Sequence, residues 1–149
     1  MIDLLRRLFT PDPEPLTDTD ARVALAALLV RVAKSDGIYL SEEIARIDRI
    51  LSARYELNPV EAMQLRARAE EVERDAPDTV RFTRAIKAAV PYEQRMAVTE
   101  ALWSVAIADG VRGDDETALM RTVAPLLGIS DPDNAIARQR AEAALTTRG

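Results

Sequence analysis

The 149-residue chain contains neither cysteine nor histidine. Without thiolate and imidazole groups, zinc fingers, histidine-based zinc hydrolases and redox CxxC motifs are excluded. Cysteine proteases and Ser-His-Asp hydrolases are excluded as well, because their nucleophile or their base is missing. Any metal site must therefore be built from oxygen ligands, which suits calcium, magnesium or manganese.

Glycine and aromatic residues are scarce, with five glycines and 4% Phe, Trp and Tyr. Strands favour aromatic and β-branched residues, whereas the alanine, leucine, arginine and glutamate that are abundant here favour helices. No run alternates between apolar and polar residues. The sequence predicts an all-α protein of about seven helices in a single main domain.

A net positive charge and long apolar runs are also lacking. A net charge of −5 provides no global positive field, so we expect no nucleic-acid partner. The uncharged stretches Val23–Val30 and Ala101–Ala108 have eight residues each, and residues 122–130 form one of nine, whereas a bilayer-spanning helix needs about 20. No signal-peptide pattern begins the chain, and we expect a cytoplasmic protein.

The first sixteen residues differ from the rest. Residues 1–9 place apolar side chains at helical spacing and predict a short amphipathic helix. Residues 10–16 carry three prolines at alternate positions and predict an extended linker, followed by a helical domain over residues 17–149. Three alternatives remain open for the N-terminal helix: it completes the fold, it contacts a partner or a membrane surface, or it frays.

Capping residues, Asp-Gly pairs and prolines divide the domain into helices. The predicted helices cover residues 17–35, 41–55, 58–74, 78–90, 91–108, 114–127 and 131–145. We expect Trp103 and Tyr92 to anchor the core. The arginines of the segments 66–68 and 138–140 are expected on solvated helix faces.

The chain matches itself at a shift of 73 residues. Each half reads as an apolar helix, an Asp-Gly pair, a Glu seven residues after the Asp, a further helix, and Asn or Asp before Pro. The matched positions are Leu29, Val32, Ala33, Asp36, Gly37, Glu43, Ala45, Pro59 and Ala62 with Leu102, Val105, Ala106, Asp109, Gly110, Glu116, Ala118, Pro132 and Ala135. We predict two pseudo-repeated units, residues 28–71 and 101–144, that pack around a pseudo-twofold axis and are joined by the helix between them.

Each half resembles the ADG-x5-E signature of the tellurite-resistance TerB-like family. The signature stands here as residues 32–37 with Glu43, and as residues 105–110 with Glu116. The short amphipathic start before a proline-rich linker resembles the stand-alone branch of that family. The resemblance implies an all-helical module with two acidic turns that bind metal cations, acting without enzyme activity in stress-associated and often membrane-linked complexes.

The candidate metal ligands are Asp36, Glu43, Asp109 and Glu116. In each half the Asp ends one helix and the Glu lies in the first turn of the next, so a short loop can bring both carboxylates to one calcium, magnesium or manganese ion. The same residues are also suited to ending and starting helices, because Asp closes Asx turns and Glu in a first turn caps backbone amides. The sequence leaves both interpretations open.

Three functions follow from these alternatives. The leading one is a non-enzymatic TerB-like accessory module that binds a divalent cation through the paired turns. The second is a protein-interaction adaptor in which the turns are purely structural. The third, a carboxylate-only metal hydrolase, requires all four acids to converge. The expected partners are an unidentified protein, which the resemblance places in a membrane-associated complex, or a second copy of the chain in a homo-oligomer.

Overall fold

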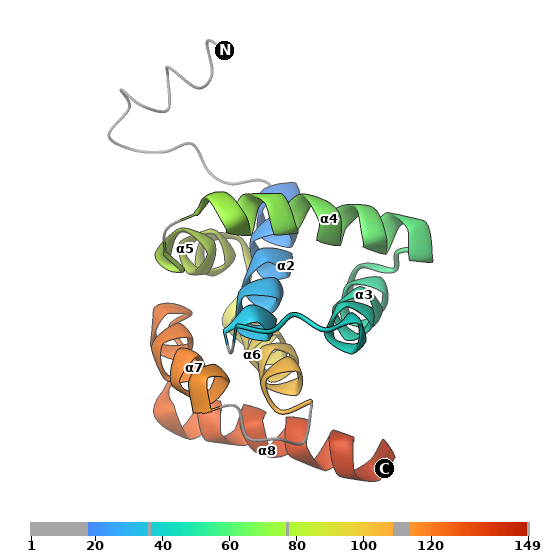
Figure 1. Cartoon of the computed structure of the whole chain (residues 1–149). Coiled ribbons are helices and arrows are strands. Elements are labelled where there is room, and N and C mark those ends of the chain that lie inside the picture. The colour runs from blue at the N-terminus through green and yellow to red at the C-terminus, as the bar shows by residue number, and fades with distance from the viewer. Residues whose placement is uncertain (1–17, 36, 77, 109–113, 149) are drawn as a thin grey trace, which may run out of the picture.

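A computed structural model describes residues 18–35, 37–76, 78–108 and 114–148, and within these residues it consists of helices joined by short turns and loops, without strands (Figure 1). The helices of the described residues are α2 (Asp18–Lys34), α3 (Ser41–Tyr55), α4 (Pro59–Asp75), α5 (Val80–Ala89), α6 (Tyr92–Ala106), α7 (Asp114–Leu126) and α8 (Asp131–Arg148). The all-α prediction is confirmed. The predicted helix at residues 1–9 and the linker at residues 10–16 lie outside the described residues.

Local capping explains why the helix boundaries match those predicted to within about three residues. At the start of α4, the side chain of Asn58 accepts a hydrogen bond from the backbone N–H of Glu61 at 2.8 Å. The carboxylate of Glu61 in turn accepts from the backbone N–H of Asn58 at 3.0 Å, and Pro59 occupies the first helical position. These are short-range interactions, so they are readable from a few consecutive residues.

Helix α2 runs through the middle of the molecule (Figure 1) and packs against α3, α4, α5, α6 and α7. Every residue from Val23 to Val30 is buried, and Ala26 to Val30 have no exposed surface. A helix that is apolar all round is stable in water only when other helices cover all of its faces. Helices α3 to α7 supply that cover.

An ion-pair cluster ties the C-terminal end of α2 to the end of α4. The carboxylate of Glu73 accepts hydrogen bonds from Arg31 at 3.0 and 3.1 Å and from Lys34 at 2.7 Å. The Arg31 guanidinium also donates to the backbone carbonyls of Glu73 and Ala76, at 2.9 and 2.7 Å. Arg31 therefore provides a partner for the Ala76 carbonyl and shares the Glu73 carbonyl with the backbone N–H of Ala76, which caps α4.

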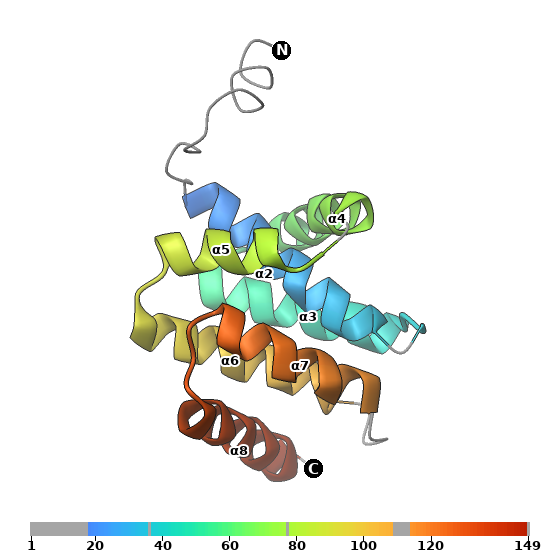
Figure 2. The same cartoon turned by 90° about the vertical axis from the view of Figure 1, so that its left-hand side faces the viewer.

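The second half of the chain packs on the other side of α2. Helix α6 contacts both α7 and α8, and Figure 2 shows α7 alongside α6 with α8 beyond them. Trp103 on α6 is buried and donates a hydrogen bond from Nε1 to Oδ1 of Asn134 on α8 at 2.8 Å. The guanidinium of Arg138 lies 4.9 Å from the centre of the Trp103 ring, so this arginine covers the indole instead of standing on a purely solvated face.

The prediction that Tyr92 anchors the core is wrong, because 37% of this residue is exposed. Tyr92 is the first residue of α6, where few neighbours surround it, and its hydroxyl donates a hydrogen bond to the carboxylate of Asp133 on α8. The prediction for Trp103 is confirmed. Both rings bind the first turn of α8 through a polar atom, one from inside the core and one from its edge.

The two predicted units share the same order of helices. In the first, α2 packs against α3 and α4; in the second, α6 packs against α7 and α8; and α5 connects the two. Asp109 and Gly110 lie outside the described residues, so their turn is not compared with the one at Gly37. The pseudo-twofold superposition of residues 28–71 on 101–144 stays a prediction.

The Glu73 cluster predicts a specific dependence of stability on pH. Burial by itself raises the pKa of Glu73, but the hydrogen bonds and charges of Lys34 and Arg31 outweigh this and hold the pKa below its usual value of 4.5. The folded protein therefore binds a proton at Glu73 less readily than the unfolded chain does. The stabilisation is complete above about pH 4.5 and is lost as the pH falls through the lowered pKa.

We expect Glu73→Gln to lower the free energy of unfolding by about 2 kcal/mol at neutral pH, because a charged acceptor is lost. The difference from the wild type should shrink as the pH falls from 6 to 3, measured by urea denaturation at each pH. Glu71→Gln, at an exposed position two residues earlier, is the control and should have little effect. A Glu73→Gln deficit that stays constant over this pH range would contradict the role assigned to the ion pairs.

Candidate functional site

The first acidic turn begins where α2 ends. The backbone N–H of Gly37 donates to the carbonyl of Lys34 at 2.9 Å, and Gly37 has φ +84°. That left-handed conformation is strained for residues with a side chain, although a Cβ atom at Gly37 would meet nothing within 4 Å. The requirement for glycine is thus conformational, and residues 38–40 then lead into α3. Asp36 itself lies outside the described residues.

Glu43 is the candidate ligand whose side chain the structure describes. It lies in the first turn of α3 and is only 8% exposed. Its Oε1 atom accepts a hydrogen bond from the backbone N–H of Leu40 at 3.1 Å, while its own N–H donates to the Leu40 carbonyl at 3.0 Å. Glu43 therefore caps the start of α3, as one of the two interpretations of the sequence expected.

The remaining predicted ligands are not brought together by the described residues. Asp109 lies outside them, and Glu116 belongs to the first turn of α7, where its side chain is also outside the described part. Among the side chains that the structure does describe, no group of three or more acidic residues is placed to hold a metal ion. The assignment of Asp36, Glu43, Asp109 and Glu116 to metal binding stays a prediction.

A second polar cluster fastens the segment after this turn to α3 and α4. The hydroxyl of Tyr39 donates to the carboxylate of Glu70 on α4 at 2.7 Å. Arg66, also on α4, donates from Nε to Asp48 on α3 at 2.6 Å and from Nη1 to Glu70 at 3.2 Å. The turn that carries Gly37 is thus held between two networks, one around Glu73 and one around Glu70.

The environment of this cluster shifts two pKa values. Burial, followed by the hydrogen bond and charge of Glu70, raises the pKa of the Tyr39 hydroxyl well above its usual value, so it remains a proton donor. Burial alone would lower the pKa of Arg66, but the hydrogen bond and charge of Asp48, with those of Glu70, outweigh it and raise the pKa. Both groups keep their protons, which suits a structural clamp and not acid–base chemistry.

The prediction that Arg66 lies on a solvated face is wrong, because its side chain is only 14% exposed. The partner that buries it, Asp48, is 18 positions away on another helix and could not be identified from local spacing. Arg68 and Arg140 are exposed, as expected.

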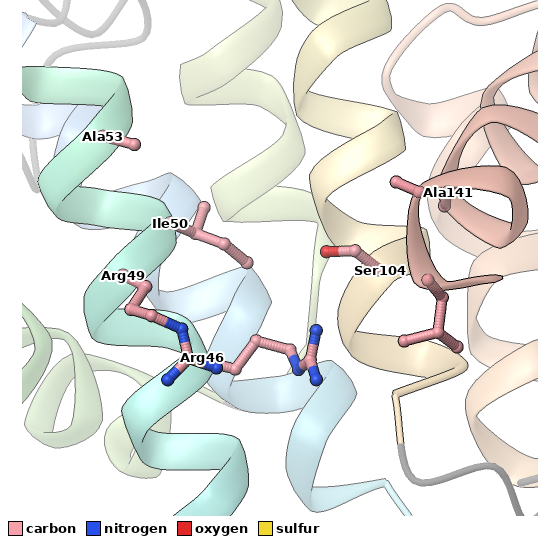
Figure 3. A pocket seen from close by; sticks show the side chains of 8 residues that line it. Arg46, Arg49, Ile50, Ala53, Ser104 and Ala141 are labelled. Atoms are coloured by element: carbon pink, nitrogen blue, oxygen red, sulfur yellow. The ribbon is translucent and has the colours of Figure 1, made fainter. Parts of the chain in front are cut away.

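A cleft of about 340 Å³ lies between α3, α6 and α8. Helices α3 and α8 both pack against α6, but over their described residues they do not pack against each other, which leaves the space open. Arg46, Arg49 and Ile50 line it from α3, Ser104 from α6 and Leu145 from α8 (Figure 3). The sequence reasoning missed this cleft; the available signal was the i, i+3, i+4 spacing of Arg46, Arg49 and Ile50 on one helix face.

Comparison with known proteins points to one family. The family model described as tellurite resistance protein TerB matches residues 22–139, which covers every helix described above at least in part. Comparison with curated proteins and with solved structures gives no significant match. No helix of the described residues is long and apolar enough to cross a membrane. Because the family model matches most of the sequence, the chain belongs to the TerB family of tellurite resistance proteins.

Proposed function

We propose that this TerB-family chain is a non-enzymatic accessory module that acts in the cytoplasm within a stress-associated complex, and that its acidic turns bind a divalent cation. The main observation that supports this proposal is the geometry of the turn between α2 and α3. Gly37 redirects the backbone there, so one short loop joins the end of α2 to the first turn of α3, which carries the buried Glu43. Calcium accepts such irregular sets of carboxylate and carbonyl oxygens.

The electrostatics of the neighbouring residues support the same proposal. Arg31 and Lys34 are the basic residues in the last turn of α2, and both bind Glu73 on α4. Their positive charge is therefore directed to α4. The pairing with Glu73 offsets part of their positive charge, so these two side chains oppose a cation at the neighbouring turn less strongly.

The adaptor remains the second candidate, and one observation favours it. The Glu43 carboxylate already accepts the hydrogen bond of the Leu40 amide, so part of its function is to start α3. In the adaptor, the turns only punctuate helices and the surfaces between helices bind the partner. The two functions differ in whether a cation stabilises the fold.

The first test is a thermal melt of the full chain after chelation, with calcium, magnesium or manganese added back. A bound cation at 100 times its dissociation constant stabilises the folded state by about 2.7 kcal/mol. For a domain of this size that corresponds to a rise in Tm of several degrees. An unchanged Tm with all three ions would overturn cation binding and leave the adaptor.

The second test replaces the aspartates of the two turns. Asn caps helices and forms Asx turns about as well as Asp, so Asp36→Asn and Asp109→Asn should each change the metal-free stability by less than about 1 kcal/mol. If the aspartates are ligands, the stabilisation by the cation should fall or vanish. We expect the larger loss for Asp109→Asn, because Asp114, Asp115 and Glu116 follow it in sequence. Equal cation responses in the wild type and both variants would mean that the turns are structural.

The third test separates the two roles of Glu43. Gln retains an acceptor oxygen for the Leu40 amide, whereas Ala retains none, so only Glu43→Ala should lose about 1 kcal/mol of metal-free stability. A ligand role predicts that both variants also lose the response to the cation. Should Glu43→Gln respond to the cation as the wild type does, Glu43 is a cap alone.

A further inference from the structure

We propose that the cleft between α3, α6 and α8 binds a small anionic amphiphile, a molecule with one carboxylate on a short apolar tail. This inference goes beyond the proposed function and does not depend on cation binding. It rests on the shape of the cleft, on the charge of its lining and on the order of charged and apolar groups along α3.

The shape follows from the packing of three helices. Helix α6 contributes Ser104 between α3 and α8. Both helices contact α6, and their described residues do not contact each other. The resulting volume of about 340 Å³ lies at the lower end of the range for small-molecule sites. A cleft of this size admits a short ligand.

The charge of the lining has one sign. The charged side chains among the described lining residues are Arg46 and Arg49, although the chain as a whole carries a net charge of −5. Arg49 is more than one-third exposed and forms no ion pair or hydrogen bond with another side chain in the described part of the chain. A guanidinium group binds a carboxylate with two parallel hydrogen bonds. The lining is thus complementary to an anion.

The apolar residues of the lining are the reason for proposing a ligand with an apolar tail. Figure 3 shows the guanidinium groups of Arg46 and Arg49 at one end of the cleft, with Ile50 and Ala53 further along α3. Ala144 and Leu145 line it from α8. A carboxylate at the arginines therefore places its tail against Ile50 and Ala53, where removing methylene groups from water favours binding. An inorganic anion would leave this surface uncovered.

The arginines belong to a concave cleft, which favours a free ligand over the surface of an anionic bilayer. A flat membrane surface would contact basic side chains that project outwards, without needing the apolar walls between them. The proposal is therefore a dissolved amphiphile, and membrane binding is an outcome that the test must distinguish.

The experiment titrates the full chain with octanoate and follows binding by isothermal titration calorimetry, with octanol and acetate as comparisons. Octanol lacks the charge and acetate lacks the tail, so both should bind at least tenfold more weakly than octanoate. Arg49→Gln and Ala144→Glu should each weaken octanoate binding at least tenfold. Arg49→Gln removes the positive charge of the arginine, and Ala144→Glu adds a carboxylate that repels the ligand at an exposed lining position.

Matched controls lie on α8 outside the lining. Arg140→Gln removes an exposed arginine and Ala143→Glu adds a carboxylate at an exposed neighbour of Ala144, and both should bind within twofold of the wild type. Far-ultraviolet circular dichroism establishes that all four variants fold. The proposal is overturned if octanoate shows no saturable binding, if the controls lose as much affinity as the cleft variants, or if the chain binds only vesicles of anionic lipid.

Discussion

The burial of α2 on all its faces is the constraint on which the rest of the structure depends. An uncharged run from Val23 to Val30 has no polar face to present to water, and each large side chain in it gains about 1.5–3 kcal/mol by burial. That gain is available only when several helices surround α2 together. The positions of α3 to α7 follow from this need, and α8 is added through its contacts with α6 and α7.

The basic residues at the C-terminal end of α2 help to fix the position of the first turn. Arg31 and Lys34 leave the apolar interior beside α4, where both pair with the carboxylate of Glu73 and Arg31 also donates to two backbone carbonyls. The chain turns at Gly37 directly afterwards, and the Tyr39–Glu70 hydrogen bond fastens the next residues to α4. The described residues on either side of the acidic turn are therefore each fastened to α4.

The ligand role proposed for Glu43 and its structural role involve the same side chain. Glu43 caps α3 through the Leu40 amide, so a cation at this turn would compete with, or share, an interaction that starts a helix. The cleft differs from the turn, because its lining residues Arg46, Arg49 and Ser104 lie within α3 and α6 and not in a loop between helices. It arises because α6 separates α3 from α8, and it can bind a ligand without altering the core.

The sequence by itself determined the helical class, the order and approximate bounds of the helices, and the family. Capping at Asn58, Pro59 at a first turn and the break at Gly37 act over a few residues, so local patterns were sufficient. Because capping acts over such short distances, the sequence also offered helix capping as one of two roles for Glu43, beside metal binding. Only the tertiary structure decided the exposure of Tyr92, the burial of Arg66 and the existence of the cleft. The hydrogen-bond partners Asp48 of Arg66 and Asp133 of Tyr92 lie 18 and 41 positions away on other helices. Burial and ion pairing at such sequence distances depend on how whole helices pack.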